Sequence, residues 1–302
     1  MAEVMGWFTD PLGYAFMVRG LIAVIIVGVV CAVLGTYIVL RGMAFMGDAL
    51  AHAILPGVAV GYLWSGGNPL WVFIGALLAG IGTAFSIGAI SRSNIKEDTA
   101  IGVMFAGMFA LGIAMISSVR SYTVDLTHFL FGNVLGVSTT DLWLIGLFGG
   151  LVLLTILGFY KQFLVMSFDP LLATTLRLPT TFLRYLLLLL IAVTIVLSLQ
   201  AVGIALVSAM LVTPAATASL LSRRLPVMMI LAATIGAASG VVGLYLSFYA
   251  NIASGPAIVL VCTAAFLVAF LFSPRQGVLR RVINNHQEQR HTEPSESIRE
   301  AV

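Results

Sequence analysis

Long apolar runs separated by short polar stretches fill most of this chain. A helix needs about 20 mainly apolar residues to cross the hydrocarbon core of a bilayer. The pattern therefore predicts an all-α, polytopic membrane protein with about nine transmembrane helices. The expected spans are residues 14–40, 43–64, 70–90, 99–117, 141–160, 182–199, 202–221, 227–249 and 256–273.

The segments between these runs differ in length and character. Residues 118–140 form the longest stretch on one side, and their apolar part is too short to span, which predicts a re-entrant or interfacial helix. Residues 161–181 form the longest stretch on the other side. After Ser273 the chain turns polar, so we expect a transmembrane domain over 1–273 and a disordered polar tail over 274–302.

Composition supports a lipid environment and argues against other classes. The chain is 60% hydrophobic and 9% charged, with a mean hydropathy of +1.09. No block of Lys and Arg with interleaved aromatic residues is present, which argues against a nucleic-acid partner. Cys31 and Cys262 lie far apart in apolar runs and form no metal-binding spacing. The run from Arg19 to Leu40 is too long for a cleaved signal and predicts a retained helix.

The basic residues predict an orientation. Cytoplasmic loops carry an excess of Lys and Arg. If nine helices alternate, most basic residues fall on one side, and only Arg19 and Arg120 fall on the other. We therefore expect a multi-pass membrane protein with the N-terminus outside and the C-terminus in the cytoplasm. The residues on the expected cytoplasmic side are Arg41, Arg92, Lys96, Lys161, Arg177, Arg184, Arg223, Arg224, Arg275, Arg280 and Arg281.

Asp48 and His52 are the strongest candidates for chemistry. They are spaced i and i+4, so they share one face of a helix within an apolar span. Ionisable residues inside a membrane are costly and usually mark a pathway. A carboxylate oxygen and an imidazole nitrogen form a ligand set for a divalent transition metal. We therefore predict that this pair binds an ion in transit, although such a pair can also simply join two helices by a hydrogen bond.

Two ligands do not complete a metal shell, which takes four to six donors. A homodimer with its two-fold axis beside this helix would supply two Asp and two His. Pro56 and Gly57 can loosen the helix just after His52 and open backbone carbonyls toward a cavity.

Other polar motifs have simpler interpretations. Asp125 and His128 are typical of a solvated external loop, although an outer metal relay is an alternative. Glu97-Asp98-Thr99 is expected to cap a helix that begins at Thr99. The Gly-x-x-x-Gly pairs at 57–61 and 236–240 favour close packing inside the molecule over a dimer face.

The sequence contains no catalytic signature. There is no Gly-x-Ser-x-Gly, no His-Glu-x-x-His and no phosphate-binding Gly-x-x-x-x-Gly-Lys-Ser/Thr loop. The chain is therefore predicted not to be an enzyme, and ATP-driven transport would need another subunit. Two internal segments, Phe168–Pro179 and Thr213–Pro226, have the composition of ordinary positive-inside loops, and a partner-docking role is the alternative.

Three segments resemble the permease subunit of zinc/manganese-type ABC importers. They are the two internal segments above and Arg41-Gly-Met-Ala-Phe-Met-Gly-Asp-Ala-Leu-Ala-His-Ala-Ile-Leu-Pro-Gly57. The likeness runs from about residue 14 to 273, and Gly-Asp-x-x-x-His is its most specific part. Three later stretches are also similar to the family: Leu130–Asn133, Val202–Thr217 and Ser254–Pro256.

The resemblance implies a fold like that of the importers for vitamin B12 and iron chelates. It implies a homodimer with two cytoplasmic ATPase subunits and an extracytoplasmic metal-binding protein. Asp48 and His52 match the positions expected to hold the ion. The segment after Pro214 is similar to the cytoplasmic loop that docks on the ATPase, which implies contacts from Pro214, Ser222, Arg223 and Arg224. The polar tail is longer than the family pattern requires.

The transported metal is expected to be Mn(II), with Zn(II) or Fe(II) as alternatives, and no cofactor is expected to stay bound. Carboxylate and imidazole suit all three ions, and no thiolate lies near the pair in the sequence. The residues around Asp48 and His52 are more similar to those of the manganese members of the family. One rival function is a proton-coupled secondary metal transporter, which would need further intramembrane carboxylates as a relay. Another is an intramembrane metalloenzyme, which would need a third ligand and a general base.

Overall fold

The computed structural model describes residues 10–66, 68–93, 95–117 and 134–273, and every regular element in these ranges is a helix. The elements are η1 (Pro11–Gly13), α2 (Ala15–Leu40), α3 (Met46–Ala53), α4 (Leu55–Ser65), α5 (Pro69–Ile90), α6 (Glu97–Ser117), η2 (Val134–Gly136), α8 (Thr139–Gly158), α9 (Tyr160–Phe168), α10 (Pro170–Thr175), α11 (Thr180–Val202), α12 (Ile204–Leu221), α13 (Leu225–Ala250) and α14 (Ser254–Phe272).

Nine spans in the described part of the chain are long and apolar enough to cross a membrane, with α3 and α4 together forming one of them. This confirms the predicted number and fold class. Local signals set several boundaries. The Asn68 side chain accepts a hydrogen bond from the Leu70 amide at the start of α5, and Ser138 and Asp141 form a capping box at the start of α8.

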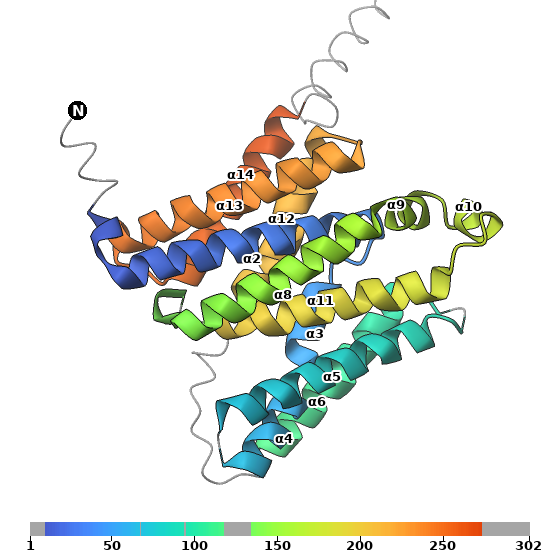
Figure 1. Ribbon diagram of the computed structural model, residues 1–302, viewed down its shortest axis with the longest axis horizontal. Coiled ribbons are helices and arrows are strands. Elements are labelled where there is room, and N and C mark those ends of the chain that lie inside the picture. Colours follow the sequence, from blue (N-terminus) through green and yellow to red (C-terminus); the bar gives the residue numbers. More distant parts are fainter. Residues whose placement is uncertain (1–9, 67, 94, 118–133, 274–302) are drawn as a thin grey trace, which may run out of the picture.

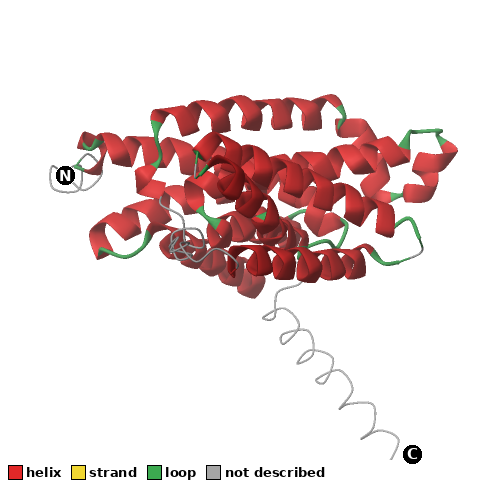
Figure 2. Ribbon diagram, turned by 90° about the horizontal axis from the view of Figure 1, so that it is seen from below, coloured by secondary structure: helices red, strands yellow, loops and turns green. Residues whose placement is uncertain are grey.

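The long helices run roughly along one common direction (Figure 2). In Figure 1, α2, α8 and α11 lie between the group of α13 and α14 and the group of α4, α5 and α6. Helix α2 packs against α13, α12 and α8. The short helix α3 connects the two sides, because it contacts α6 and α5 as well as α12 and α11. The candidate ion-binding residues on α3 therefore lie between the two groups of helices.

Glycine allows the closest helix contacts. A Cβ atom on Gly57 would lie 2.1 Å from the carbonyl oxygen of Gly75, and one on Gly236 would lie 2.8 Å from that of Gly28. Neither position has room for a side chain, so α4 packs on α5 and α13 on α2 through glycine. Both Gly-x-x-x-Gly motifs thus serve internal packing, as expected.

The segment between the fifth and sixth spans contains two short helices, α9 and α10, where only a loop was expected. Helix α10 ends at Thr175, and α11 begins at Thr180. The side chain of Asp169 caps α10 by accepting a hydrogen bond from the Leu172 amide. The predicted interfacial helix, Asp125, His128 and the polar tail lie outside the described residues.

Candidate functional site

Asp48 and His52 lie on α3 and face each other across one helical turn. Asp48 Oδ1 lies 3.7 Å from His52 Nε2, which is longer than a hydrogen bond. The His52 side chain is 18% exposed and the Asp48 side chain 41% exposed. Two donors of one ion with bonds of about 2.1 Å can be at most about 4.2 Å apart. The observed separation therefore allows both side chains to bind a single metal ion.

Helix α6 packs two aromatic rings against the His52 ring. The rings of Phe105 and Phe109 on α6 meet it edge-on, with centroids 5.7 and 5.3 Å away. Just beyond His52 the helix is interrupted at Ile54, whose amide donates to the His52 carbonyl. Pro56 lies in the first turn of α4 and supplies no amide hydrogen, so the sequence breaks the helix where Pro56 and Gly57 were expected to loosen it.

One copy of the chain supplies only part of a metal shell. Among the residues that the structure describes, no group of three or more His, Cys, Asp or Glu side chains converges. Both cysteines are buried in other helices, so neither adds a thiolate to the pair. A bound ion would need further donors from water, backbone carbonyls or a second copy.

The residues expected to dock an ATPase lie in two different environments. Ser222, Arg223 and Arg224 form the turn between α12 and α13, and both arginines are exposed. Pro214 lies inside α12 and is buried, so it precedes this turn and forms no part of it. Membrane helices accommodate an internal proline because neighbouring helices compensate for its missing amide. The α12 helix continues through it to Leu221.

An ion-pair cluster was not predicted from the sequence. The Glu97 carboxylate lies 3.1 Å from the Arg41 guanidinium and 2.5 Å from that of Arg184. It thereby joins the end of α2 and the starts of α6 and α11. Burial lowers the pKa of Arg41, and Glu97 opposes that change by favouring the charged guanidinium. The expectation that α6 begins at Thr99 with Glu97 outside it was wrong, because Glu97 is the first residue of the helix.

Comparison with known proteins identifies the family. The model of the ABC 3 transport family matches residues 13–273, which include every described helix except the start of η1. The chain belongs to the ABC 3 transport family. This ABC 3 chain is therefore a multi-pass membrane permease of an ABC transport system.

Several relatives of this ABC 3 chain have been named for their cargo. The manganese transport system membrane protein MntC of Halalkalibacterium halodurans is 49% identical over 93% of this chain and 95% of its own length. The manganese import system permease protein ScaB of Streptococcus gordonii is 44% identical over 89% of this chain and 96% of its own length. The chelated iron transport system membrane protein YfeD of Yersinia pestis is 41% identical over 90% of this chain and 91% of its own length.

Two solved structures share the fold of this ABC 3 chain. PsaBC from Streptococcus pneumoniae, solved in complex with Fab, has a TM-score of 0.79 and 41% identity, covering 92% of this chain and 99% of the solved chain. An inward-facing metal-chelate type ABC transporter has a TM-score of 0.70 at 15% identity, covering 84% of this chain and 85% of its own. The second likeness shows the fold alone, and it agrees with the predicted similarity to importers for metal chelates.

Proposed function

We propose that this chain is the membrane permease of an ABC importer that carries Mn(II) into the cytoplasm, with Asp48 and His52 binding the ion in transit. The observation that carries the proposal is the placement of these two side chains. They lie 3.7 Å apart on one face of a helix in the middle of the bundle, where ionisable groups are costly unless they have a function.

Manganese is favoured over zinc and iron as the cargo. Oxygen and nitrogen donors suit Mn(II), whereas the soft thiolates that favour zinc or copper are absent from the described surroundings of the pair. Relatives at 49% and 44% identity are named as manganese permeases. A relative at 41% identity is named for chelated iron, so iron is the cargo that a competition experiment must separate from manganese.

The permease is proposed to work as a homodimer. In a single copy the Asp48 side chain is 41% exposed on a membrane span, and an uncovered carboxylate at that depth is unfavourable. A second copy related by a two-fold axis would cover it and add two donors. The complete transporter would further contain two cytoplasmic ATPase subunits, because the chain has no phosphate-binding loop of its own. It would also contain an extracytoplasmic metal-binding protein, as the resemblance to zinc/manganese-type importers implies.

Two exposed features at one end of the molecule are suited to docking the ATPase. One is the turn of Ser222, Arg223 and Arg224. The other is α10, where Leu171 is 78% exposed although the helix is too short to span a membrane. Phe168, Leu172 and Leu176 on and beside α10 are also 54%, 45% and 56% exposed, and such a group of exposed apolar residues is typical of a surface that a partner covers.

Uptake of radiolabelled Mn(II) by the transporter reconstituted in liposomes, with and without ATP hydrolysis, tests the function. Asp48→Asn and His52→Ala should each reduce ATP-driven uptake at least about tenfold, because each removes one metal ligand. Membrane insertion and assembly with the ATPase should persist in both variants.

Asp98→Asn makes the same carboxylate-to-amide change at an exposed position on α6 and should transport as the wild type does. Competition with excess unlabelled Fe(II) or Zn(II) reports the preferred ion. Uptake at the wild-type rate by both site variants would refute the assignment of the pair. Uptake that proceeds without ATP hydrolysis would instead favour the proton-coupled alternative.

A further inference from the structure

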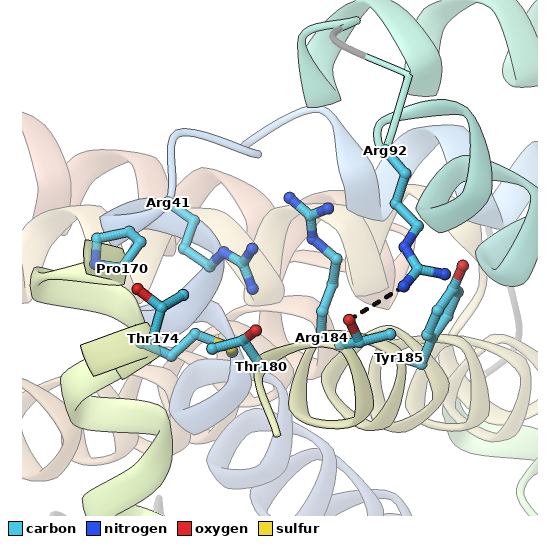
Figure 3. A pocket seen from close by; sticks show the side chains of 9 residues that line it. Arg41, Arg92, Pro170, Thr174, Thr180, Arg184 and Tyr185 are labelled. Atoms are coloured by element: carbon cyan, nitrogen blue, oxygen red, sulfur yellow. Dashed lines mark hydrogen bonds between the residues drawn. The ribbon is translucent and has the colours of Figure 1, made fainter. Parts of the chain in front are cut away.

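A cavity of about 250 Å³ opens at one end of the bundle, away from Asp48 and His52. It lies where the end of α2, the residues after α5 and the start of α11 meet helices α9 and α10 (Figure 3). None of its lining residues belongs to α3 or α4. The cavity is therefore separate from the Asp48 and His52 pair. The polar residues that line it include Arg41, Arg92, Arg184, Thr174, Thr180 and Thr181.

Positive charge dominates this cavity. Figure 3 shows the guanidinium groups of Arg41, Arg184 and Arg92 in a row along it. Glu97 is the carboxylate that pairs with Arg41 and Arg184. Arg92 takes part in none of the ion pairs between described residues. It donates a hydrogen bond of 3.1 Å to the Thr181 hydroxyl and lies 5.9 Å from the centre of the Tyr185 ring. One carboxylate among three arginines leaves the cluster with a surplus of two positive charges.

The backbone adds to this positive potential. Helix α11 begins at Thr180, and no side chain caps its first turn. The N-terminal end of a helix carries a partial positive charge and unpaired amide hydrogens. Because Thr180 and Thr181 both line the cavity, this helix end lies beside the arginines.

The chemistry of the lining selects an anion. A divalent cation would be repelled by the surplus positive charge. Guanidinium groups offer forked donors that match the oxygens of phosphate, and threonine hydroxyls add single donors. The volume is several times the roughly 30 Å³ of a water molecule in the liquid, so it accommodates a phosphate group with some of its hydration. We propose that this cavity is a binding site for a phosphate group, held by Arg92 and Arg184 with the threonine hydroxyls.

Two molecules can bring that group to the site. The helices around the cavity end here, at the level where the phosphates of a lipid leaflet would lie, so the headgroup of an anionic phospholipid is one source. The cavity is also open to the aqueous phase beyond the bundle through the exposed residues Arg92 and Thr174, so a free phosphate is the other. Both would use the same donors.

Binding by the purified full-length chain in detergent tests the proposal and separates the two sources. One arm titrates dioleoyl phosphatidylglycerol and follows lipid adducts by native mass spectrometry, with the zwitterionic dioleoyl phosphatidylcholine as the control lipid. The other arm titrates inorganic phosphate by calorimetry at constant ionic strength. Saturable binding is expected in at least one arm.

The variants then assign the binding to this cavity. Arg92→Gln should weaken the binding about tenfold or more, because it removes a charged forked donor, and Arg92→Lys should weaken it less. Arg92 is exposed and outside the described ion pairs, so the variant is expected to fold as the wild type does. Lys161→Gln removes one charge from an exposed residue of α9 that does not line the cavity, and it should bind normally.

Each outcome has a definite meaning. Binding of phosphatidylglycerol alone that depends on Arg92 supports a lipid headgroup, and Arg92-dependent binding of inorganic phosphate supports a free anion. Absence of saturable binding in both arms, equal binding of phosphatidylcholine, or an unchanged affinity in Arg92→Gln would overturn the proposal. None of these measurements involves transport, so the result is independent of the proposed function.

Discussion

Individual residues were predictable where the signal is local. Asp48 and His52 stand out in the sequence because a spacing of four residues places both on one helix face whatever the rest of the fold does. Their remaining partners were not predictable. Phe105 and Phe109, which pack against the His52 ring, come from another helix more than fifty residues later, and no periodicity in the sequence links them to His52.

Glu97 shows how a long-range contact overrides a local rule. An acidic residue at the start of a helix is a good candidate for a cap, and that rule placed Glu97 just before α6. Its side chain instead reaches Arg41 and Arg184, which are 56 residues before it and 87 residues after it. Three helices share this one carboxylate, so it holds their ends together.

Replacement of Glu97 should therefore destabilise the folded chain. Glu97→Gln leaves Arg41 and Arg184 close together without a carboxylate between them, and we expect a loss of about 2 kcal/mol of unfolding free energy. The measurement is the thermal unfolding of the purified chain in detergent. Asp98→Asn is the matched control, because Asp98 is an exposed neighbour that forms none of the described ion pairs. Equal unfolding temperatures for the two variants would mean that the cluster does not stabilise the bundle.

At the scale of helices, hydropathy predicted the spans well because each must match the thickness of the bilayer. The expected range 14–40 became α2 (Ala15–Leu40), and the expected ranges 182–199 and 202–221 became α11 and α12 with a turn at Gly203. The break at Ile54 and the short helices α9 and α10 were harder, since segments of this length have no membrane thickness to match. Helix neighbours were not predictable, because apolar faces in lipid look alike.

Close helix packing gives a prediction at this scale. A Cβ atom on Gly35 of α2 would lie 1.8 Å from the carbonyl oxygen of Leu211 on α12. Backbone cannot move aside as a side chain can, so Gly35→Ala must push the two helices apart. We expect a loss of about 3 kcal/mol, at the upper end of the usual cost of overpacking.

A matched variant separates this clash from the general effect of removing glycine. A Cβ atom on Gly82 of α5 would meet nothing within 4 Å, so Gly82→Ala should leave the unfolding temperature unchanged or slightly higher. The unfolding temperature in detergent again serves as the measurement. If Gly35→Ala were as stable as Gly82→Ala, the described contact between α2 and α12 would be wrong.

At the scale of the whole molecule, the predicted alternation of span direction agrees with where three of the basic residues lie. Arg41, Arg92 and Arg184 were assigned to the same side from the sequence, and the structure brings all three to one cavity. Their convergence agrees with an even number of crossings between them. Which side of the membrane this end faces is still a prediction, and it rests on the positive-inside rule.

Cysteine labelling in sealed cells tests that orientation. Ala253 lies in the exposed turn between α13 and α14, and Ser93 lies in the exposed turn after α5. With the N-terminus outside, Ala253→Cys should react with an impermeant thiol reagent, whereas Ser93→Cys should react only after the cells are opened. The native cysteines, Cys31 and Cys262, are buried and should give little background. The reverse labelling pattern would place the arginine-lined end outside.

Coupling to an ATPase is the prediction that depends on this orientation and on assembly. Arg223 and Arg224 project from the turn between α12 and α13, at an end that the labelling is expected to place in the cytoplasm. Reversing both charges should remove their attraction to acidic groups on the docked ATPase and add repulsion. ATP-driven Mn(II) uptake by the reconstituted transporter should therefore fall severalfold, and the chain alone should hydrolyse no ATP.

One variant on α10 and one control variant on α9 make this test specific. Leu171→Glu on α10 should also lower uptake if α10 is a docking surface, because a carboxylate would replace an apolar contact. Lys161→Glu reverses a charge on α9 and should leave uptake close to that of the wild type. Loss of uptake in the α10 variant with normal uptake in the double arginine variant would assign coupling to α10 and remove Arg223 and Arg224 from it. Normal uptake in both would mean that the ATPase docks on neither surface.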